Sequence, residues 1–162
     1  GRVLSCRVDG DVGILQKPVA LALAPDATLS WSWKIDRLPA TEAEDTFFTH
    51  DYLSIAVEFD DGRDLTYTWS AALPEGHAYA CPLPTWTARE THLVIRSGAE
   101  GLGSWIRESR NVREDYARTM GEPPARIVAV WLIAVSIFRR GLGLAEYRDI
   151  SLSAAGETIH VF

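Results

Sequence analysis

Apolar and polar residues alternate with a period of two along most of this chain. Residues 28–36 carry Leu, Trp, Trp and Ile at every second position, with Ser and Lys between them. Residues 52–59 repeat the pattern, and the Asp61-Gly62 dipeptide that follows is typical of a hairpin turn because it tolerates positive φ angles. Strands that bury one face show such alternation, so the sequence predicts a fold built from sheets.

About nine strands are expected, joined by turns that draw on 12 Gly and 8 Pro residues. The strand at 126–138 is apolar on both faces, which is typical of a central strand. This many strands in 162 residues predicts one all-β domain over 1–162, a two-sheet β-sandwich of jelly-roll or lectin-like type. The expected strands cover residues 3–8, 19–24, 28–36, 52–59, 65–69, 92–97, 126–138, 144–153 and 158–162.

One helical segment is predicted at about 104–120. Asn111 followed by Glu114 resembles a capping box, and Gly121 before two prolines would end the helix. We expect a short turn at 104–108 and a longer helix from Asn111. This helix is expected to cover the outer face of the strand at 126–138.

Charge and cysteine content exclude several classes of protein. The formal net charge is −6 and no basic patch is present, which argues against nucleic-acid binding. The longest uncharged apolar run, 127–138, is too short to cross a bilayer. Cys6 and Cys81 are interpreted as buried free thiols, with a disulfide as the alternative, and no metal site is expected because no histidine has a suitable spacing. No signal peptide is visible, which favours a cytoplasmic location.

Four segments of the chain are similar to a known bacterial family. They are LSWSWKIDRLP at 29–39, LTYTWS at 65–70, LVIRSGAEGLGSWIRESRNVREDYARTMGEPP at 93–124 and AEYRDISL at 145–152. Together they resemble domain-of-unknown-function family 3047 (DUF3047). The resemblance implies a lectin-like or jelly-roll β-sandwich and brings no established biochemical role.

The chain departs from this family at two places. Where the family carries an acidic pair and then Arg before the Asp-Gly hairpin, this chain has His50 and Asp51 and no Arg. Where the family has a stretch rich in Asp, Thr and Asn, this chain has AVSIFRR at 134–140. The departures imply that a polar site, of a kind that could hold an ion or a sugar, is apolar here.

Strand parity selects the candidate catalytic residues. Glu146 and Arg148 share the parity of core positions in 144–153, and Asp51 shares that of core positions in 52–59. A charge that points inward must be paired or face a solvated cleft, so a structural ion pair at the sandwich rim is the alternative. The candidate catalytic set is Asp51, the adjacent His50 as a proton shuttle, Tyr67, Glu146 and Arg148.

Two further expectations concern acidic residues and a histidine. Asp51 and Glu146 could also serve as paired carboxylates for glycoside cleavage. His92 lies on the face opposite Leu93 and is expected at the surface.

The aromatic content is high, with six Trp. Parity points Trp31, Trp33, Tyr67, Trp69 and Trp131 inward, where they either build the core or line a cleft. The candidate ligand contacts are Trp31, Trp33, Trp69, Trp131 and Phe138.

The expected function follows from the absence of known catalytic motifs and from the aromatic residues. No Gly-x-Ser-x-Gly elbow, phosphate loop, His-Glu-x-x-His or dinucleotide fingerprint is present, so no cofactor is expected. We expect a lipophilic small molecule in an aromatic-lined cleft and a cofactor-free tailoring reaction that closes a ring. The alternatives are a non-catalytic, lectin-like carbohydrate-binding module and a domain that forms a homo-oligomer or binds a partner through an exposed apolar face on 126–138.

Overall fold

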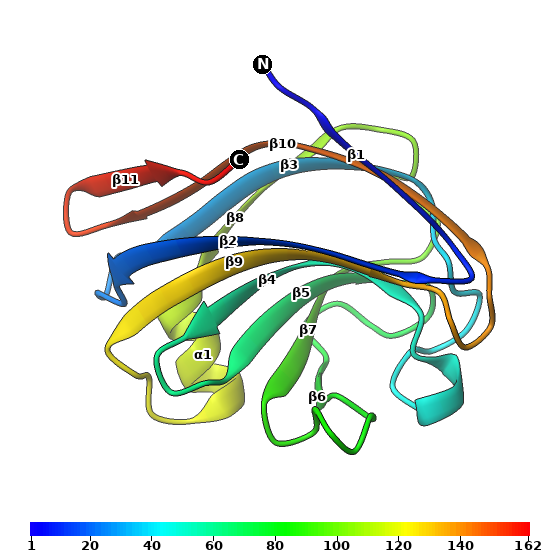
Figure 1. Cartoon of the computed structure of the whole chain (residues 1–162), viewed down its shortest axis with the longest axis horizontal. Coiled ribbons are helices and arrows are strands. Elements are labelled where there is room, and N and C mark those ends of the chain that lie inside the picture. Colours follow the sequence, from blue (N-terminus) through cyan, green and yellow to red (C-terminus); the bar gives the residue numbers. More distant parts are fainter.

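The computed structural model describes residues 1–162 and contains eleven strands, one α-helix and one short 3-10 helix (Figure 1). In chain order these are β1 (Leu4–Asp9), β2 (Val12–Ala22), β3 (Thr28–Arg37), η1 (Phe47–Thr49), β4 (Tyr52–Phe59), β5 (Asp64–Ser70), β6 (Ala78–Ala80), β7 (Glu90–Ser97), β8 (Ile106–Asn111), α1 (Val112–Met120), β9 (Arg126–Val135), β10 (Leu142–Ala154) and β11 (Glu157–His160).

The strands form two sheets that stack face to face, as the β-sandwich prediction required (Figure 1). The smaller sheet has the order β1-β10-β3-β8, with β11 paired to β10. The larger, six-stranded sheet has the order β2-β9-β4-β5-β7-β6. Every pairing is antiparallel except that of β5 with β7, which is parallel.

The expected strands at 28–36, 52–59 and 65–69 agree with β3, β4 and β5, where alternation is clearest. Several segments differ from the prediction; the short edge strand β6, for example, was not expected. β2 begins at Val12 because it pairs along nearly the whole of β9, although most of its side chains are exposed. Residues 106–111 form the strand β8 rather than a helical turn, because their backbone pairs with β3 at the sheet edge.

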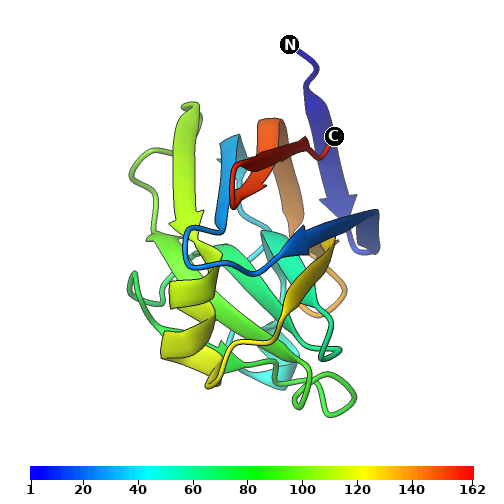
Figure 2. The ribbon, with the colours of Figure 1, turned by 90° about the vertical axis from the view of Figure 1, so that its left-hand side faces the viewer.

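The helix begins where the capping residue predicted. The Asn111 side chain accepts a hydrogen bond from the Glu114 backbone N–H at 3.0 Å, and Gly121 ends the helix with a φ of 101°. However, α1 packs at one side of the sandwich, where Val112 and Tyr116 join the core (Figure 2). It therefore leaves the outer face of β9 open, contrary to expectation. No helix is long and apolar enough to span a membrane.

Large aromatic side chains fill the space between the sheets. Trp31 and Trp33 of β3 face Tyr67 and Trp69 of β5, and all four are essentially inaccessible to solvent. The ring centroids lie 5.6 Å apart for Trp31 and Tyr67 and 5.7 Å apart for Trp33 and Trp69. The three tryptophans of this group are therefore core residues, and their assignment as contacts in a cleft is corrected.

A bulge in β10 reverses the parity on which Glu146 and Arg148 were assigned to the interior. The register with β3 shifts between Arg148 and Ser151, and Asp149 adopts a positive φ of 55°. Ile150 therefore points inward, whereas Glu146 and Arg148 point outward. Glu146 forms an ion pair with Lys34 at 2.7 Å on the outer face of the smaller sheet.

Replacing Trp31 by Ala should lower the free energy of unfolding by about 3–5 kcal/mol, because it leaves a cavity between the sheets. Urea unfolding measures the loss as a lower midpoint at an unchanged slope. The matched control is Trp131→Ala, whose side chain lies on the outer face and is only half-buried. We expect the control to lose less than half as much stability, and equal losses would contradict the assignment of Trp31 to the core.

Candidate functional site

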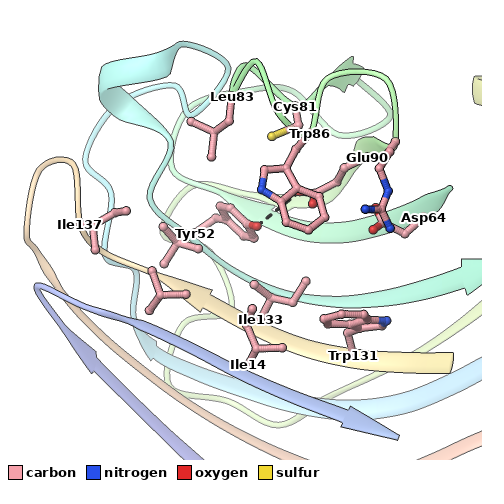
Figure 3. A pocket seen from close by; sticks show the side chains of 13 residues that line it. Ile14, Tyr52, Asp64, Cys81, Leu83, Trp86, Glu90, Trp131, Ile133 and Ile137 are labelled. Atoms are coloured by element: carbon pink, nitrogen blue, oxygen red, sulfur yellow. Dashed lines mark hydrogen bonds between the residues drawn. The ribbon is translucent and has the colours of Figure 1, made fainter. Parts of the chain in front are cut away.

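A pocket of about 220 Å³ lies on the outer face of the six-stranded sheet (Figure 3). One wall comes from β2, β9 and the turn after β9, and the other from the segment 81–89, with three polar side chains between them. Ten of its thirteen lining residues are hydrophobic. The lining is Val12, Ile14, Trp131, Ile133, Val135 and Ile137 on the first wall, Cys81, Leu83, Trp86 and Arg89 on the second, and Tyr52, Asp64 and Glu90 between.

The apolar wall follows from the pairing of two strands that are apolar on their outer faces. Trp131 and Ile133 point outward from β9, and Ile14 lies beside Ile133 in β2. No helix covers this surface, so Ile14 remains 56% exposed. Trp131 was expected to point inward and to contact a ligand; it points outward, and it lines this pocket. Its ring N–H donates to the Glu58 carboxylate at 3.0 Å.

The polar end of the pocket holds two carboxyl groups on neighbouring strands. Asp64 of β5 lies in register with Glu90 of β7. Burial, and then the nearby charges of Glu90 and Glu58, raises the pKa of Asp64 to about 8. Burial also acts to raise the pKa of Glu90, but hydrogen bonding and charge from His92 lower it overall. Asp64 is therefore protonated and Glu90 ionised at neutral pH.

Glu90 and Cys81 also belong to a group of four buried side chains that could hold a metal ion. Their potential ligand atoms all lie within 4.8 Å of one another. We call these residues, His50, Cys81, Glu90 and His92, the His-Cys-Glu-His cluster. His92 was expected at the surface, but it is fully buried because other segments of the chain cover this part of the sheet.

Burial keeps the thiol and one imidazole of the cluster neutral. Burial, and then the charge of His92, lowers the pKa of His50 to about 4. Burial raises the pKa of Cys81 to about 12. A neutral thiol is a poor nucleophile, so Cys81 is not activated in this form. Cys6 and Cys81 are both free thiols, as interpreted from the sequence, but only Cys81 is fully buried and Cys6 is partly exposed.

A family model agrees with the resemblance noted from the sequence. Residues 1–151 match the family described as a protein of unknown function (DUF3047). The chain belongs to the DUF3047 family. The match includes every residue of the pocket and all strands except β11 and the end of β10.

A solved structure shares the fold of this DUF3047 protein. It is the xyloglucanase domain of NopAA, a type three effector from Sinorhizobium fredii, in complex with cellobiose. The two chains are 11% identical with a TM-score of 0.53, over 93% of this chain and 81% of the other. This similarity supports the β-sandwich fold alone. No curated protein sequence matches the chain.

The five predicted catalytic residues of this DUF3047 protein do not converge. Asp51 is buried, and its carboxylate accepts backbone N–H groups of Phe138 at 3.0 Å and Arg139 at 2.7 Å, which anchors the turn after β9. Tyr67 donates to Asp115 of α1 at 2.9 Å inside the sandwich.

Glu146 and Arg148 lie on the other sheet, where Arg148 stacks on the Trp105 ring at 4.1 Å. His50 lies near the pocket through its 3.5 Å contact with Cys81, one of the lining residues.

Of the predicted ligand contacts, Trp131 lines the pocket and Phe138 lies beside it. The Phe138 ring lies 5.6 Å from that of Phe47 and 6.5 Å from that of His50, between centroids. The pocket residues that sequence reasoning missed include Ile14, Trp86 and Asp64. The period-two pattern of Val12 and Ile14 could have pointed to β2, whereas nothing in the sequence shows that Trp86 folds back over the sheet.

Replacing Asp64 by Asn should change the pH dependence of stability. Between pH 4 and 8 the unfolded chain loses the Asp64 proton while the folded chain keeps it, so folding becomes less favourable as pH rises. We expect Asp64→Asn to raise Tm by roughly 5 °C at pH 8 and to leave it nearly unchanged at pH 4. The exposed Asp45→Asn is the control and should change Tm at neither pH. An equal effect of Asp64→Asn at both pH values would contradict the raised pKa.

Proposed function

We propose that this protein binds a lipophilic small molecule in the pocket between β2, β9 and the segment 81–89. The observation that carries the proposal is the lining, in which ten of thirteen residues are hydrophobic. Ligand sites of this kind are concave and mostly apolar, with a few polar groups that orient the ligand. Here the carboxyl groups of Asp64 and Glu90 lie together at one end of an otherwise aliphatic and aromatic surface (Figure 3).

The polar groups of the pocket are largely occupied by one another, which favours an apolar ligand over a sugar. Tyr52 donates to Glu90 at 3.3 Å, and Arg89 donates from Nε to the Gly62 carbonyl at 3.1 Å. Asp64 Oδ1, in contrast, is buried without a partner. A sugar needs partners for several hydroxyl groups, whereas a lipophilic ligand with one polar end needs only Asp64.

The size of the pocket limits what it holds. A volume of about 220 Å³ is below the roughly 300–1,000 Å³ of drug-sized sites. The pocket therefore suits a small ligand or one end of a longer one. Phe47 and Phe48 are exposed on η1, and Phe47 contacts Phe138 next to the pocket residue Ile137. These rings offer an apolar surface for the remainder of a longer ligand.

The catalytic form of the proposal is cofactor-free ring closure. In a cycloaddition two π bonds of the substrate become two σ bonds, so no proton, electron or co-reactant has to be supplied. The protein then contributes shape, by folding the substrate between Trp86 and Trp131, and a polar contact from Asp64.

Ile14→Asn should weaken binding of the uncharged fluorescent probe N-phenyl-1-naphthylamine at least about tenfold, because it places a polar group on the apolar wall. Fluorescence titration measures the Kd. The matched control is Leu15→Asn, which changes the next residue of β2, also exposed but outside the pocket, and should leave the Kd unchanged. Equal weakening by both variants, or no probe binding by the native chain, would contradict the proposal.

Probe displacement and size-exclusion chromatography distinguish this proposal from carbohydrate binding and from oligomerisation. Cellobiose that stabilises the protein or displaces the probe, where lipophilic compounds do not, would replace the proposal with carbohydrate binding. A native chain that elutes as a dimer in size-exclusion chromatography, and as a monomer after Ile14→Asn, would mean that a second copy covers the pocket. We expect a monomer that binds the apolar probe.

Ring closure conserves mass, which gives a direct assay. Conjugated dienes tethered to an activated alkene should yield a product of equal mass and changed retention in liquid chromatography with mass detection. Asp64→Asn should slow this conversion about tenfold or more while Asp45→Asn does not. A native chain that binds these compounds and converts none of them would contradict the catalytic form and leave a binding protein.

A further inference from the structure

Four side chains of metal-binding type meet in a buried position beside the pocket, and two of them, Cys81 and Glu90, also line it. His50 follows η1, Cys81 follows β6, and Glu90 and His92 lie two residues apart on β7. All four are at least nine-tenths buried, and their potential ligand atoms lie within 4.8 Å of one another. Three separate segments therefore bring two imidazoles, a thiol and a carboxylate to one point.

His50 is oriented so that one ring nitrogen faces the other groups. Its Nδ1 lies 2.7 Å from the Glu44 carbonyl oxygen, which can only accept, so Nδ1 carries the proton. Its Nε2 is then unprotonated, and it lies 3.5 Å from Cys81 Sγ. A histidine that donates one N–H to a carbonyl and turns the other nitrogen to a metal is the usual arrangement in metal sites.

The spacing and the charge also fit a divalent ion. A tetrahedral zinc site with Zn–S near 2.3 Å and Zn–N near 2.05 Å places sulfur and nitrogen about 3.5 Å apart, which matches the separation of Cys81 Sγ and His50 Nε2. A thiolate and a carboxylate with two neutral imidazoles carry two negative charges, which a divalent cation neutralises. Within the cluster His92 Nε2 is in hydrogen-bond contact with the Glu90 carboxylate, whereas His92 Nδ1 is buried with no hydrogen-bond partner.

We propose that His50, Cys81, Glu90 and His92 form a zinc site in which all four ligands come from the protein. Thiolate and imidazole ligands select zinc over the hard cations Mg²⁺ and Ca²⁺. Four protein ligands leave no open position, so the ion is structural rather than catalytic.

The zinc ion would fix the second wall of the pocket. Cys81 begins the segment that supplies Leu83 and Trp86, and its backbone already donates to the Glu90 carbonyl at 2.9 Å. The ion would join this segment and His50 to β7. The inference concerns this chain's own ligands and stands whether or not the pocket binds a lipophilic molecule.

Metal binding is tested on the folded chain after dialysis against a chelator and then metal-free buffer. Co²⁺ should bind at one ion per chain and produce an intense thiolate-to-cobalt charge-transfer band, which Zn²⁺ removes and Mg²⁺ or Ca²⁺ does not. Zn²⁺ at one hundred times its Kd should raise Tm by about 5–10 °C. No cobalt band and no zinc-dependent rise in Tm would overturn the site.

The two cysteines supply a matched pair of variants. Cys81→Ser should remove the charge-transfer band and weaken zinc binding more than the roughly 10–100-fold that loss of an outer-shell partner costs. Cys6→Ser should leave both unchanged, because Cys6 lies in β1 on the other sheet. Loss of the band in Cys6→Ser, or its survival in Cys81→Ser, would overturn the assignment.

A second measurement does not depend on a variant of the cluster. In Cys6→Ser, Cys81 is the remaining thiol of the chain. Zinc should slow its alkylation by iodoacetamide under mild denaturant at least about tenfold, and a chelator should restore the rate. An alkylation rate that zinc does not change would mean that the cluster is a metal-free hydrogen-bond network.

Discussion

The side chains of Trp31, Trp33, Tyr67 and Trp69 form an aromatic layer between the two sheets. This aromatic layer determines which face of β3 and β5 points inward. Trp33 and Trp69 are buried as whole rings, yet each N–H reaches a partner at the rim: Glu108 of β8 at 3.2 Å and the Gly98 carbonyl at 2.9 Å. Tyr67 reaches Asp115 of α1 in the same way. The layer therefore ties the edge strand and the helix to the centre of the sandwich, because a buried N–H or O–H is costly to leave unpaired. With the inner faces committed to this layer, all remaining chemistry falls on the outer faces.

The outer face of the larger sheet has two halves with opposite character. Over β2 and β9 it is apolar and open, and this half forms the wall of the pocket. Over β5 and β7 it is polar and covered, with Thr66, Thr68 and His92 almost fully buried. The covering segments bring partners with them, as when the Glu44 carboxylate accepts from the Ala71 backbone at 2.6 Å and from the Ser70 hydroxyl. The pocket lies at the boundary, so an apolar wall faces a carboxyl group.

Alternation predicted the strands whose one face meets the aromatic layer, and it predicted the β-sandwich. The prediction of inward and outward faces failed where a bulge adds a residue and shifts the alternation along a strand. The bulge at Asp149 exchanges the two faces of β10, and nothing in the sequence around Glu146 and Arg148 shows it. Strand parity also predicts the face on which a side chain lies but not whether solvent reaches that face. His92 does lie on the face opposite Leu93, but other segments of the chain cover that face and bury it. Of the predicted site residues, Trp131 lines the pocket. The sequence predicted its strand, β9, but assigned its side chain to the inner face of the sheet instead of the outer face.

The position of the candidate site follows from one parallel pairing. β5 and β7 run parallel and adjacent, and the edge strand β6 pairs with the far side of β7, so the chain leaves β5, forms β6 and returns to β7 through the segment 81–89. The aromatic layer fills the inner face, and the segment 81–89 of this connection packs on the outer face, where it lines the pocket. The return segment 81–89 therefore lies on polar side chains of the sheet and places Cys81 against His50 and Glu90. His50 lies 31 positions before Cys81 and 40 positions before Glu90 in the sequence. No spacing rule predicts that these residues meet, because their contact depends on the order of the strands in the sheet and not on distance along the chain.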